Sequence, residues 1–297
     1  MRYMSRLTGE TLVFKNKEAY EAHLRDLEKS GVMKEGKPVP KLRPGLLRKA
    51  RDIERHHTPP FTPAAFTRKE IPRPPSQVRQ RFSLVHPSRG RPDQAWECMC
   101  RWRAKCSPFN NLEYVLSLDR DDADKYRRTV REMVGTIDLR VVIHDNKTMV
   151  EALNVGARVA RGDVLIYVSD DFECPDNWDV EIQKCVGTEK DWVLFVYDGI
   201  QKSAQTISIL SRVYFERFGY IYYPEYMSLW ADPDFTETAI RLGKNIDGMH
   251  LLFRHNHYST GRSAYDPTYA KQDSEAAWKH GESLFQRRAK GNFGVKK

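Results

Sequence analysis

The chain has 297 residues and a mass of 34.6 kDa, enough for one catalytic domain of about 200 residues plus an appendage. The hydrophobic fraction is 40%, no run reaches the roughly 18 apolar residues of a membrane helix, and no signal-peptide core follows Met1, so we expect a cytoplasmic protein without a membrane span. The five cysteines are an odd number, which argues against a disulfide framework, and they lack the spacing of a structural zinc site.

The net charge of +9 lies entirely in the N-terminal part of the chain. Residues 1–80 hold 18 Lys and Arg against 9 Asp and Glu, and the two signs balance in residues 81–297. A cationic extension on a neutral body suits a polyanionic partner, because each neutralised phosphate releases counterions. Nucleic acid is the partner we expect. A membrane surface and a merely solubilising arm remain alternatives.

The N-terminal part is predicted to be an extension of the catalytic body. Apolar side chains at helical spacing predict a short helix over 17–30, and an Arg- and Lys-rich segment predicts a second over 46–56. We therefore treat 1–57 as a basic, partly helical extension. Six prolines then predict a stiff, extended linker over 58–80. At the other end, 266–297 is predicted to be a helical tail.

Between these flanks, residues 81–265 alternate strand and helix patterns. A helix is expected over 149–161, where apolar residues recur at helical spacing. Strands are expected over 81–86, 112–118, 139–144, 164–168 and 192–197. This alternation predicts an α/β domain whose sheet is mainly parallel.

The fourth of these strands ends in acid. The largely apolar run 164–168 gives way to Ser169, Asp170 and Asp171. In open α/β sheets, ligands bind beyond the carboxyl ends of the strands, so these carboxylates stand where a hard cation and a phosphate are expected. The alternative is that the acids cap a helix or solvate a turn.

The first two strands are also followed by polar segments. Ser88, Arg89, Gly90 and Arg91 form a loop whose hydroxyl, backbone and guanidinium donors can grip a ribose or phosphates. The second strand runs into an acidic cluster between 119 and 122, whose carboxylates can accept hydrogen bonds from a base or ribose. A solvated turn is the alternative for that cluster.

Together these parts resemble the nucleotide-binding half of GT-A-fold, inverting, nucleotide-sugar-dependent glycosyltransferases. The resemblance covers about 81–260 and includes an Asn-x-Gly helix at Asn154 followed by a Gly-Asp turn. It implies Asp171 as the metal ligand, although Ser169 replaces the first Asp of the signature. The residues that it assigns to the nucleotide sugar are Pro87, Ser88, Arg89, Arg91, Asp119, Asp122, Asn154 and Asp170.

The resemblance also implies a general base and a cation. Inversion needs a base opposite the leaving group, and the acidic segment that opens the next helix makes Asp232 the candidate, with Asp234 second. Both acids can instead be first-turn residues favoured by the helix dipole. In similar enzymes a later histidine completes the metal site, so His255 or His257 is expected there. The departing diphosphate calls for Mn²⁺ or Mg²⁺.

The function predicted from the sequence is metal-dependent transfer of a sugar with inversion, most simply from a UDP-sugar. For the acceptor we expect a hydroxymethylated base in DNA, as in bacteriophage genome modification, with a surface glycan or a protein as alternatives. A nucleotidyltransferase is a rival, but the first loop lacks the lysine usual there. A non-enzymatic nucleic-acid-binding protein would leave the acids unexplained. The sequence does not indicate an oligomeric state.

Overall fold

The computed structural model describes residues 3–5, 12–14, 79–257 and 274–296. The chain divides into two compact units, residues 1–59 and 60–297. In the first unit, β1 (Tyr3–Ser5) pairs antiparallel with β2 (Leu12–Phe14). The helices predicted over 17–30 and 46–56, and nearly all of the predicted linker, lie outside the described residues.

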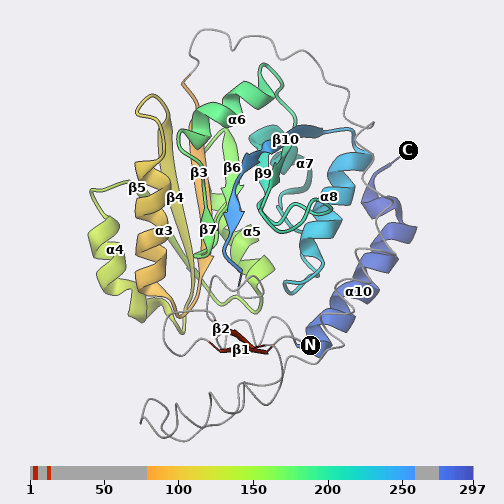
Figure 1. Ribbon diagram of the computed structural model, residues 1–297, viewed down its shortest axis with the longest axis horizontal. Helices are drawn as coiled ribbons and strands as arrows, with labels where there is room; N and C mark the ends of the chain where they lie inside the picture. The colour runs from red at the N-terminus through yellow and green to blue at the C-terminus, as the bar shows by residue number, and fades with distance from the viewer. Residues whose placement is uncertain (1–2, 6–11, 15–78, 258–273, 297) are drawn as a thin grey trace, which may run out of the picture. The chain divides into compact units, whose positions relative to one another are not determined.

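The second unit is built on a seven-stranded sheet (Figure 1). In spatial order its strands are β10 (Asn245–Leu252), β8 (Val193–Tyr197), β9 (Ile209–Ser211), β6 (Val164–Tyr167), β3 (Arg81–Ser88), β4 (Asn111–Asp119) and β5 (Asp138–His144). Every pair is parallel except those that β9 makes with β6 and β8. The α/β fold and the five predicted strands are therefore confirmed. The edge strand β10 and the antiparallel β9, only three residues long, were not predicted.

The register of the central strands aligns their carboxyl ends. Val85 of β3 is opposite Val115 of β4 on one side and Tyr167 of β6 on the other. The loops that follow these three strands therefore start at the same edge of the sheet. This edge is the place where an open parallel sheet binds ligands.

Helices cover both faces of the sheet. On one face, α3 (Pro92–Ala104) and α6 (Trp178–Val186) contribute to the same buried core as alternate residues of β3, β4 and β6. On the other face, α5 (Met149–Val159) packs so closely that a Cβ on Gly156 would lie 2.9 Å from Val85 Cγ1. The predicted helix over 149–161 is confirmed, with its end two residues earlier.

The remaining elements are a short ribbon and further helices. A two-stranded antiparallel ribbon joins β7 (Phe172–Glu173) to β11 (Arg254–His255). In addition to η2 (Ala123–Tyr126) and η4 (Asn292–Gly294), the helices are α4 (Arg127–Met133), α7 (Arg212–Phe218), α8 (Ala231–Arg241) and α10 (Glu275–Lys290). Figure 1 shows α10 alongside α8, at the side of the sheet opposite β5.

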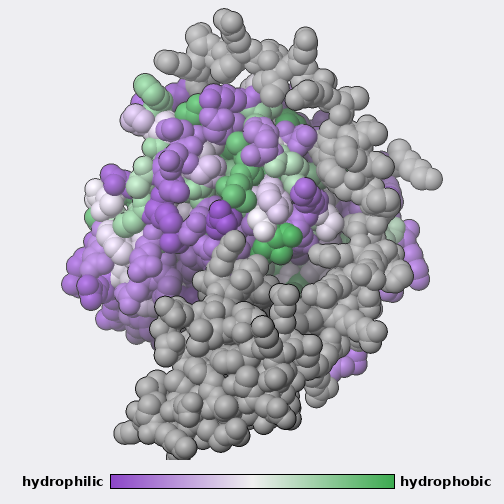
Figure 2. Space-filling model, viewed as in Figure 1, coloured by the Kyte–Doolittle hydropathy of each residue, from purple (hydrophilic) through white to green (hydrophobic). Residues whose placement is uncertain are grey.

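The outer surface is mostly hydrophilic on the side of α3 and α4. Figure 2 shows purple side chains predominating there, whereas green, apolar side chains form smaller groups nearer the centre of the view. This distribution is typical of amphipathic helices that bury one face against a sheet. Among the described residues, none of the helices has the length and hydropathy needed to cross a bilayer.

Candidate active site

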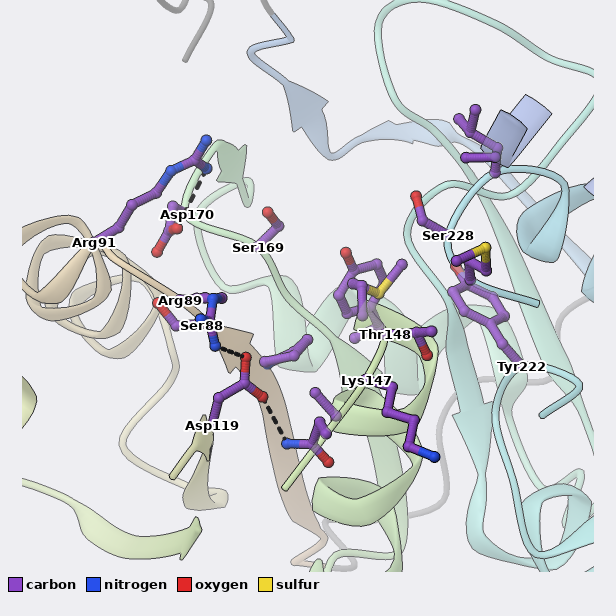
Figure 3. Close-up of a pocket in the computed structure, with 18 of the residues that line it drawn as sticks. Ser88, Arg89, Arg91, Asp119, Lys147, Thr148, Ser169, Asp170, Tyr222 and Ser228 are labelled. Atoms are coloured by element: carbon purple, nitrogen blue, oxygen red, sulfur yellow. Dashed lines mark hydrogen bonds and ion pairs between the residues drawn. The ribbon is translucent and has the colours of Figure 1, made fainter. Parts of the chain in front are cut away.

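A cavity of about 790 Å³ opens at the carboxyl edge of the sheet. Figure 3 shows the loops after β3 and β4 on one side of it, with Tyr222 and Ser228 on the opposite side. Ten of the residues singled out from the sequence line this cavity: Pro87, Ser88, Arg89, Arg91, Asp119, Asp170, Asp171, Asp232, His255 and His257. This volume is within the usual range for small-molecule sites and is large enough for a nucleotide sugar.

The loop after β3 is tied to the end of β4. Gly90 has φ +72°, which lets the chain turn sharply at a position where no side chain would fit the backbone comfortably. The Arg89 guanidinium donates to Asp121 at 2.6 and 2.7 Å, and Asn146 donates to one Asp119 oxygen at 2.9 Å. Arg89 also donates to the other Asp119 oxygen (Figure 3). Arg89 therefore holds the Asp119 carboxylate at the cavity wall.

Asp122 is a correction to the sequence assignment. Its carboxylate is 2% exposed and does not line the cavity. It accepts a hydrogen bond from Gly90 N and forms an ion pair with Lys125 at 2.6 Å. Asp122 fixes the turn at Gly90, because a buried carboxylate must be paired and hydrogen-bonded.

Asp170 belongs to a buried charge network beneath the cavity. Its carboxylate lies 3.0 Å from His86 Nε2 and 3.5 Å from Arg91 Nη1, and Nδ1 of His86 contacts the Tyr114 hydroxyl. Burial, the largest single influence, lowers the pKa of His86, but the charge and hydrogen bond of Asp170 together with Cys98 outweigh it and raise the pKa to about 10. Sequence reasoning missed His86. The signal was a titratable residue within an otherwise apolar strand.

Asp171 and His255 are brought together by the β7–β11 ribbon. His255 is paired with Phe172 in that ribbon, which places His255 Nε2 3.2 Å from Asp171 Oδ2. The rings of His255 and His257 are 5.1 Å apart, and burial together with the neighbouring His255 lowers the pKa of His257 to about 4. The extended backbone thus carries both histidines to the cavity, with His255 beside the carboxylate.

The donor set at Asp171 fits a divalent cation that is shared with a substrate. Carboxylate oxygen and imidazole nitrogen suit Mn²⁺ better than Mg²⁺, which prefers oxygen alone. In the part of the chain that the structure describes, no three His, Cys, Asp or Glu side chains form a complete metal-binding cluster. A cation held by Asp171 and His255 would therefore take its other ligands from water and diphosphate.

Asp232 is the second residue of α8 and lines the cavity as a half-buried carboxylate. Removal from water, the largest influence, and the Asp198 charge raise the pKa of Asp232, whereas a backbone hydrogen bond and His255 lower it; the net result is a pKa of about 6. A carboxylate with a pKa near 6 is ionised at neutral pH yet basic enough to take a proton.

Asp234, the alternative base, faces away from the cavity. Its carboxylate is 3% exposed and accepts from Arg288 Nε at 2.8 Å and Nη2 at 3.0 Å. The Tyr226 hydroxyl donates to it at 3.1 Å. Asp234 therefore joins α8 to α10, and among the two candidate acids only Asp232 reaches the cavity.

Asn154 is also a correction to the sequence assignment, because its amide makes hydrogen bonds within the fold. The side chain accepts from Ile221 N at 2.9 Å and Tyr222 N at 3.2 Å, and it donates to Tyr222 O at 2.7 Å. Asn154 is 2% exposed and does not line the cavity. It instead anchors the segment that presents Tyr222 to the cavity.

Several cavity residues were not singled out from the sequence, because they belong to none of the motifs or strand-end clusters described above. They are Lys147, Tyr167, Thr206, Met227, Leu229 and four residues at the start of α10, namely Ser274, Ala276, Ala277 and His280. Tyr222 lines the cavity as well. Tyr226 is fully buried and serves the core.

The sequence of residues 83–262, more than half of the chain, matches the Glycosyl transferase family 2. No curated protein sequence matches the chain. Among solved structures, S. aureus TarS aligns with a TM-score of 0.51 at 15% identity, over 59% of this chain but only 36% of TarS. TarS residues 1–349 align with a TM-score of 0.52 at 14% identity, covering 71% of this chain and 74% of that one. The same TarS fragment in complex with UDP-GlcNAc gives a TM-score of 0.50 at 16% identity, with 64% of each chain covered. The chain therefore belongs to Glycosyl transferase family 2, a family of glycosyltransferases with the GT-A fold.

Proposed function

We propose that the chain transfers a sugar from a UDP-sugar to an acceptor hydroxyl, with inversion at the sugar carbon. The observation that carries this proposal is that Asp119, Asp171 and Asp232 line one cavity at the carboxyl edge of the sheet. The three carboxylates come from three different segments, and each has a different neighbourhood. That difference lets each serve a separate task on one donor.

The donor side follows from the chemistry of these neighbourhoods. Asp119, held by Arg89 and Asn146, presents carboxylate oxygen to the N–H and hydroxyl groups of a nucleoside. UDP is the nucleotide we propose, supported by the likeness to the TarS fragment in complex with UDP-GlcNAc. Asp171 and His255 would hold a divalent cation, whose positive charge would offset the negative charge of the departing diphosphate.

The acceptor side centres on Asp232. The acceptor hydroxyl oxygen attacks the sugar carbon while its proton passes to the Asp232 carboxylate. The bond between that carbon and the UDP oxygen breaks, and UDP leaves with the electron pair. Attack opposite the leaving group inverts the configuration. Tyr222, Met227 and Leu229 line the cavity and would exclude water from the reacting atoms.

For the acceptor we propose a hydroxymethylated base in DNA, as in bacteriophage genome modification. The support is the charge of residues 1–80, which carry the entire net positive charge of the chain. A base flipped out of the duplex would reach Asp232 while the basic segment binds the phosphate backbone. A surface glycan or a protein would not account for this segment equally well.

The experiment is a screen of UDP-glucose, UDP-GlcNAc and UDP-galactose with the full chain, following UDP release with Mn²⁺, with Mg²⁺ and with EDTA. Each donor is tested alone, with unmodified DNA and with DNA containing 5-hydroxymethylcytosine. We expect metal-dependent release that rises only with the modified DNA. Metal-dependent release that did not rise with the modified DNA would reject the DNA acceptor and leave the transferase intact.

Replacing Asp171 is the matched test of the cation site. Asp171→Asn keeps the side-chain shape but removes the charge, so we expect metal-dependent UDP release to fall by a factor of about 100 or more. Asp176→Asn is the control, since Asp176 is 84% exposed in the same region of the chain. If Asp171→Asn kept the activity of Asp176→Asn, the proposed metal site would be wrong.

A further inference from the structure

The segment that leads into α8 has a backbone conformation that few aromatic residues adopt. Trp230, the residue before α8, has φ +74° and ψ −4°, in the left-handed region. A residue with a Cβ is strained there, and the strain persists only where the surroundings hold it. Because Asp232 lies two residues further on, whatever holds Trp230 also influences where the Asp232 carboxylate enters the cavity.

The helix that holds Trp230 is α10. The Trp230 ring is 5% exposed, and its centroid lies 5.4 Å from that of Trp278 and 5.3 Å from that of Phe285. A Cβ on Gly281 would lie 2.6 Å from both Leu229 O and Trp230 Cδ1, closer than real Cβ atoms approach. The backbone of α10 therefore rests directly against the turn, at a distance that only glycine permits.

The same helix also holds the chain before and after this turn. His280 Nε2 lies 2.9 Å from Glu225 O, on the N-terminal side of the turn. Arg288 binds both carboxylate oxygens of Asp234, inside the first turns of α8. The contacts of α10 thus flank Asp232 in sequence on both sides. None of these contacts involves the Asp232 carboxylate itself, so any effect on it passes through the backbone.

We propose that Gly281 and Trp230 are positioning residues for Asp232. By packing against the turn, α10 keeps Trp230 in the left-handed conformation and so fixes the carboxylate at the cavity wall. The inference rests on the proposed role of Asp232 as the base. If α10 served only to pack against α8 and to form one wall of the cavity, loosening it would reduce stability or donor binding without shifting the pH profile set by Asp232.

The test compares Gly281→Ala with Gly291→Ala in the full chain, using the UDP-sugar that the wild type turns over. Gly291 lies at the end of α10, where an added Cβ would be 3.6 Å from the nearest atom outside its own neighbours. Active sites are counted by calorimetric titration with UDP and Mn²⁺. For Gly281→Ala we expect kcat per UDP-binding site to fall about tenfold or more, with KM for the donor within about twofold. We also expect the acidic limb of the pH profile of kcat/KM to shift, which a loss of folded protein cannot cause.

Trp278→Ala gives a second route that introduces no clash. It removes one of the two rings packed on Trp230, so we expect the same changes in kcat and pH profile, and it decides the matter if Gly281→Ala does not fold. If every folded variant matched Gly291→Ala in both readouts, the positioning role would be rejected. Asp232→Asn separates this from a wider failure: if it turned over like the wild type, or if the wild type released no UDP, the proposed function itself would fall.

Discussion

At the scale of single residues, the cavity is organised by how each carboxylate is neutralised. Asp170 is matched by His86 and Arg91, whereas Asp119 is matched by Arg89. For Asp232 the opposing effect of His255 is outweighed by burial, which is the main reason that its pKa is raised. Paired carboxylates are stabilised as anions, and a desolvated one gains basicity, so the three acids are chemically distinct.

The raised pKa of Asp232 predicts opposite effects on stability and activity. The pKa is about 6 in the folded chain against 3.8 as the reference, so folding favours the protonated form. The resulting stabilisation is complete below about pH 3.8 and is lost as the pH rises through 6. Asp232→Asn should therefore raise the melting temperature at pH 8, by about 2–4 °C for each kcal/mol of this cost that it removes, and much less at pH 4. A calorimetric scan at both pH values measures this.

Activity should follow the ionised fraction of the same group. Because the base must be deprotonated, kcat/KM of the wild type should fall as the pH drops below about 6, and Asp232→Asn should show no comparable turnover at any pH. The charged groups that act on Asp232, Asp198 and His255, determine where the limb lies. A stable but fully active Asp232→Asn protein would contradict the assignment of the base.

At the scale of elements, side chains that looked functional in the sequence turn out to join one segment to another. Asn154 connects α5 to the segment at Ile221 and Tyr222, and Asp234 connects α8 to α10 through Arg288. Both groups are buried with their hydrogen bonds satisfied. Such groups contribute to stability and shape rather than to contacts with substrate.

Removing the Asn154 amide should therefore destabilise the fold. Asn154→Ala leaves the N–H groups of Ile221 and Tyr222 without their acceptor, which costs about 2 kcal/mol of unfolding free energy. Urea denaturation followed by fluorescence measures it, and UDP binding is titrated in parallel. Unchanged stability with lost UDP binding would instead restore the nucleotide contact that was predicted from the sequence.

Asp234→Asn should behave differently from Asp232→Asn. It leaves Arg288 buried without its anion, and breaking a buried ion pair in this way costs about 3 kcal/mol. We expect a clear loss of stability with a much smaller loss of kcat than in Asp232→Asn. A folded Asp234→Asn protein that had lost all turnover, beside an active Asp232→Asn, would reverse the assignment of the two acids.

At the scale of the whole molecule, the separation of charge along the chain is the feature that bears on the acceptor. Residues 1–80 carry the net positive charge, whereas the two signs balance in residues 81–297. If the basic segment binds DNA phosphates, affinity should fall linearly with the logarithm of salt concentration, by a factor set by the number of contacts.

This salt dependence can be tested with two matched pairs of substitutions. The slope of log affinity against log salt is negative, and each phosphate contact contributes about 0.9 to its magnitude. Replacing Arg48 and Arg51 by Ala should therefore make the slope shallower by up to about 2. Replacing Arg127 and Arg128 of α4, which are 77% and 84% exposed, should leave the slope unchanged. Fluorescence anisotropy with a labelled duplex gives both slopes. Equal slopes in the two variants would count against DNA docking by the N-terminal segment.

The sequence alone determined the parallel sheet and the polar edge at which Asp119, Asp170 and Asp171 lie. Strand periodicity and a change from apolar to acidic residues are local properties, and parallel strands necessarily bring their carboxyl ends to one edge. The tertiary structure decided what depends on contacts between distant segments. His255 reaches Asp171 across 84 residues through the β7–β11 ribbon, and α10 supplies one wall of the cavity. Asp232 and Asp234 differ by about 200° around a helix, so only the packing of α8 determines which carboxylate faces the cavity and which binds Arg288.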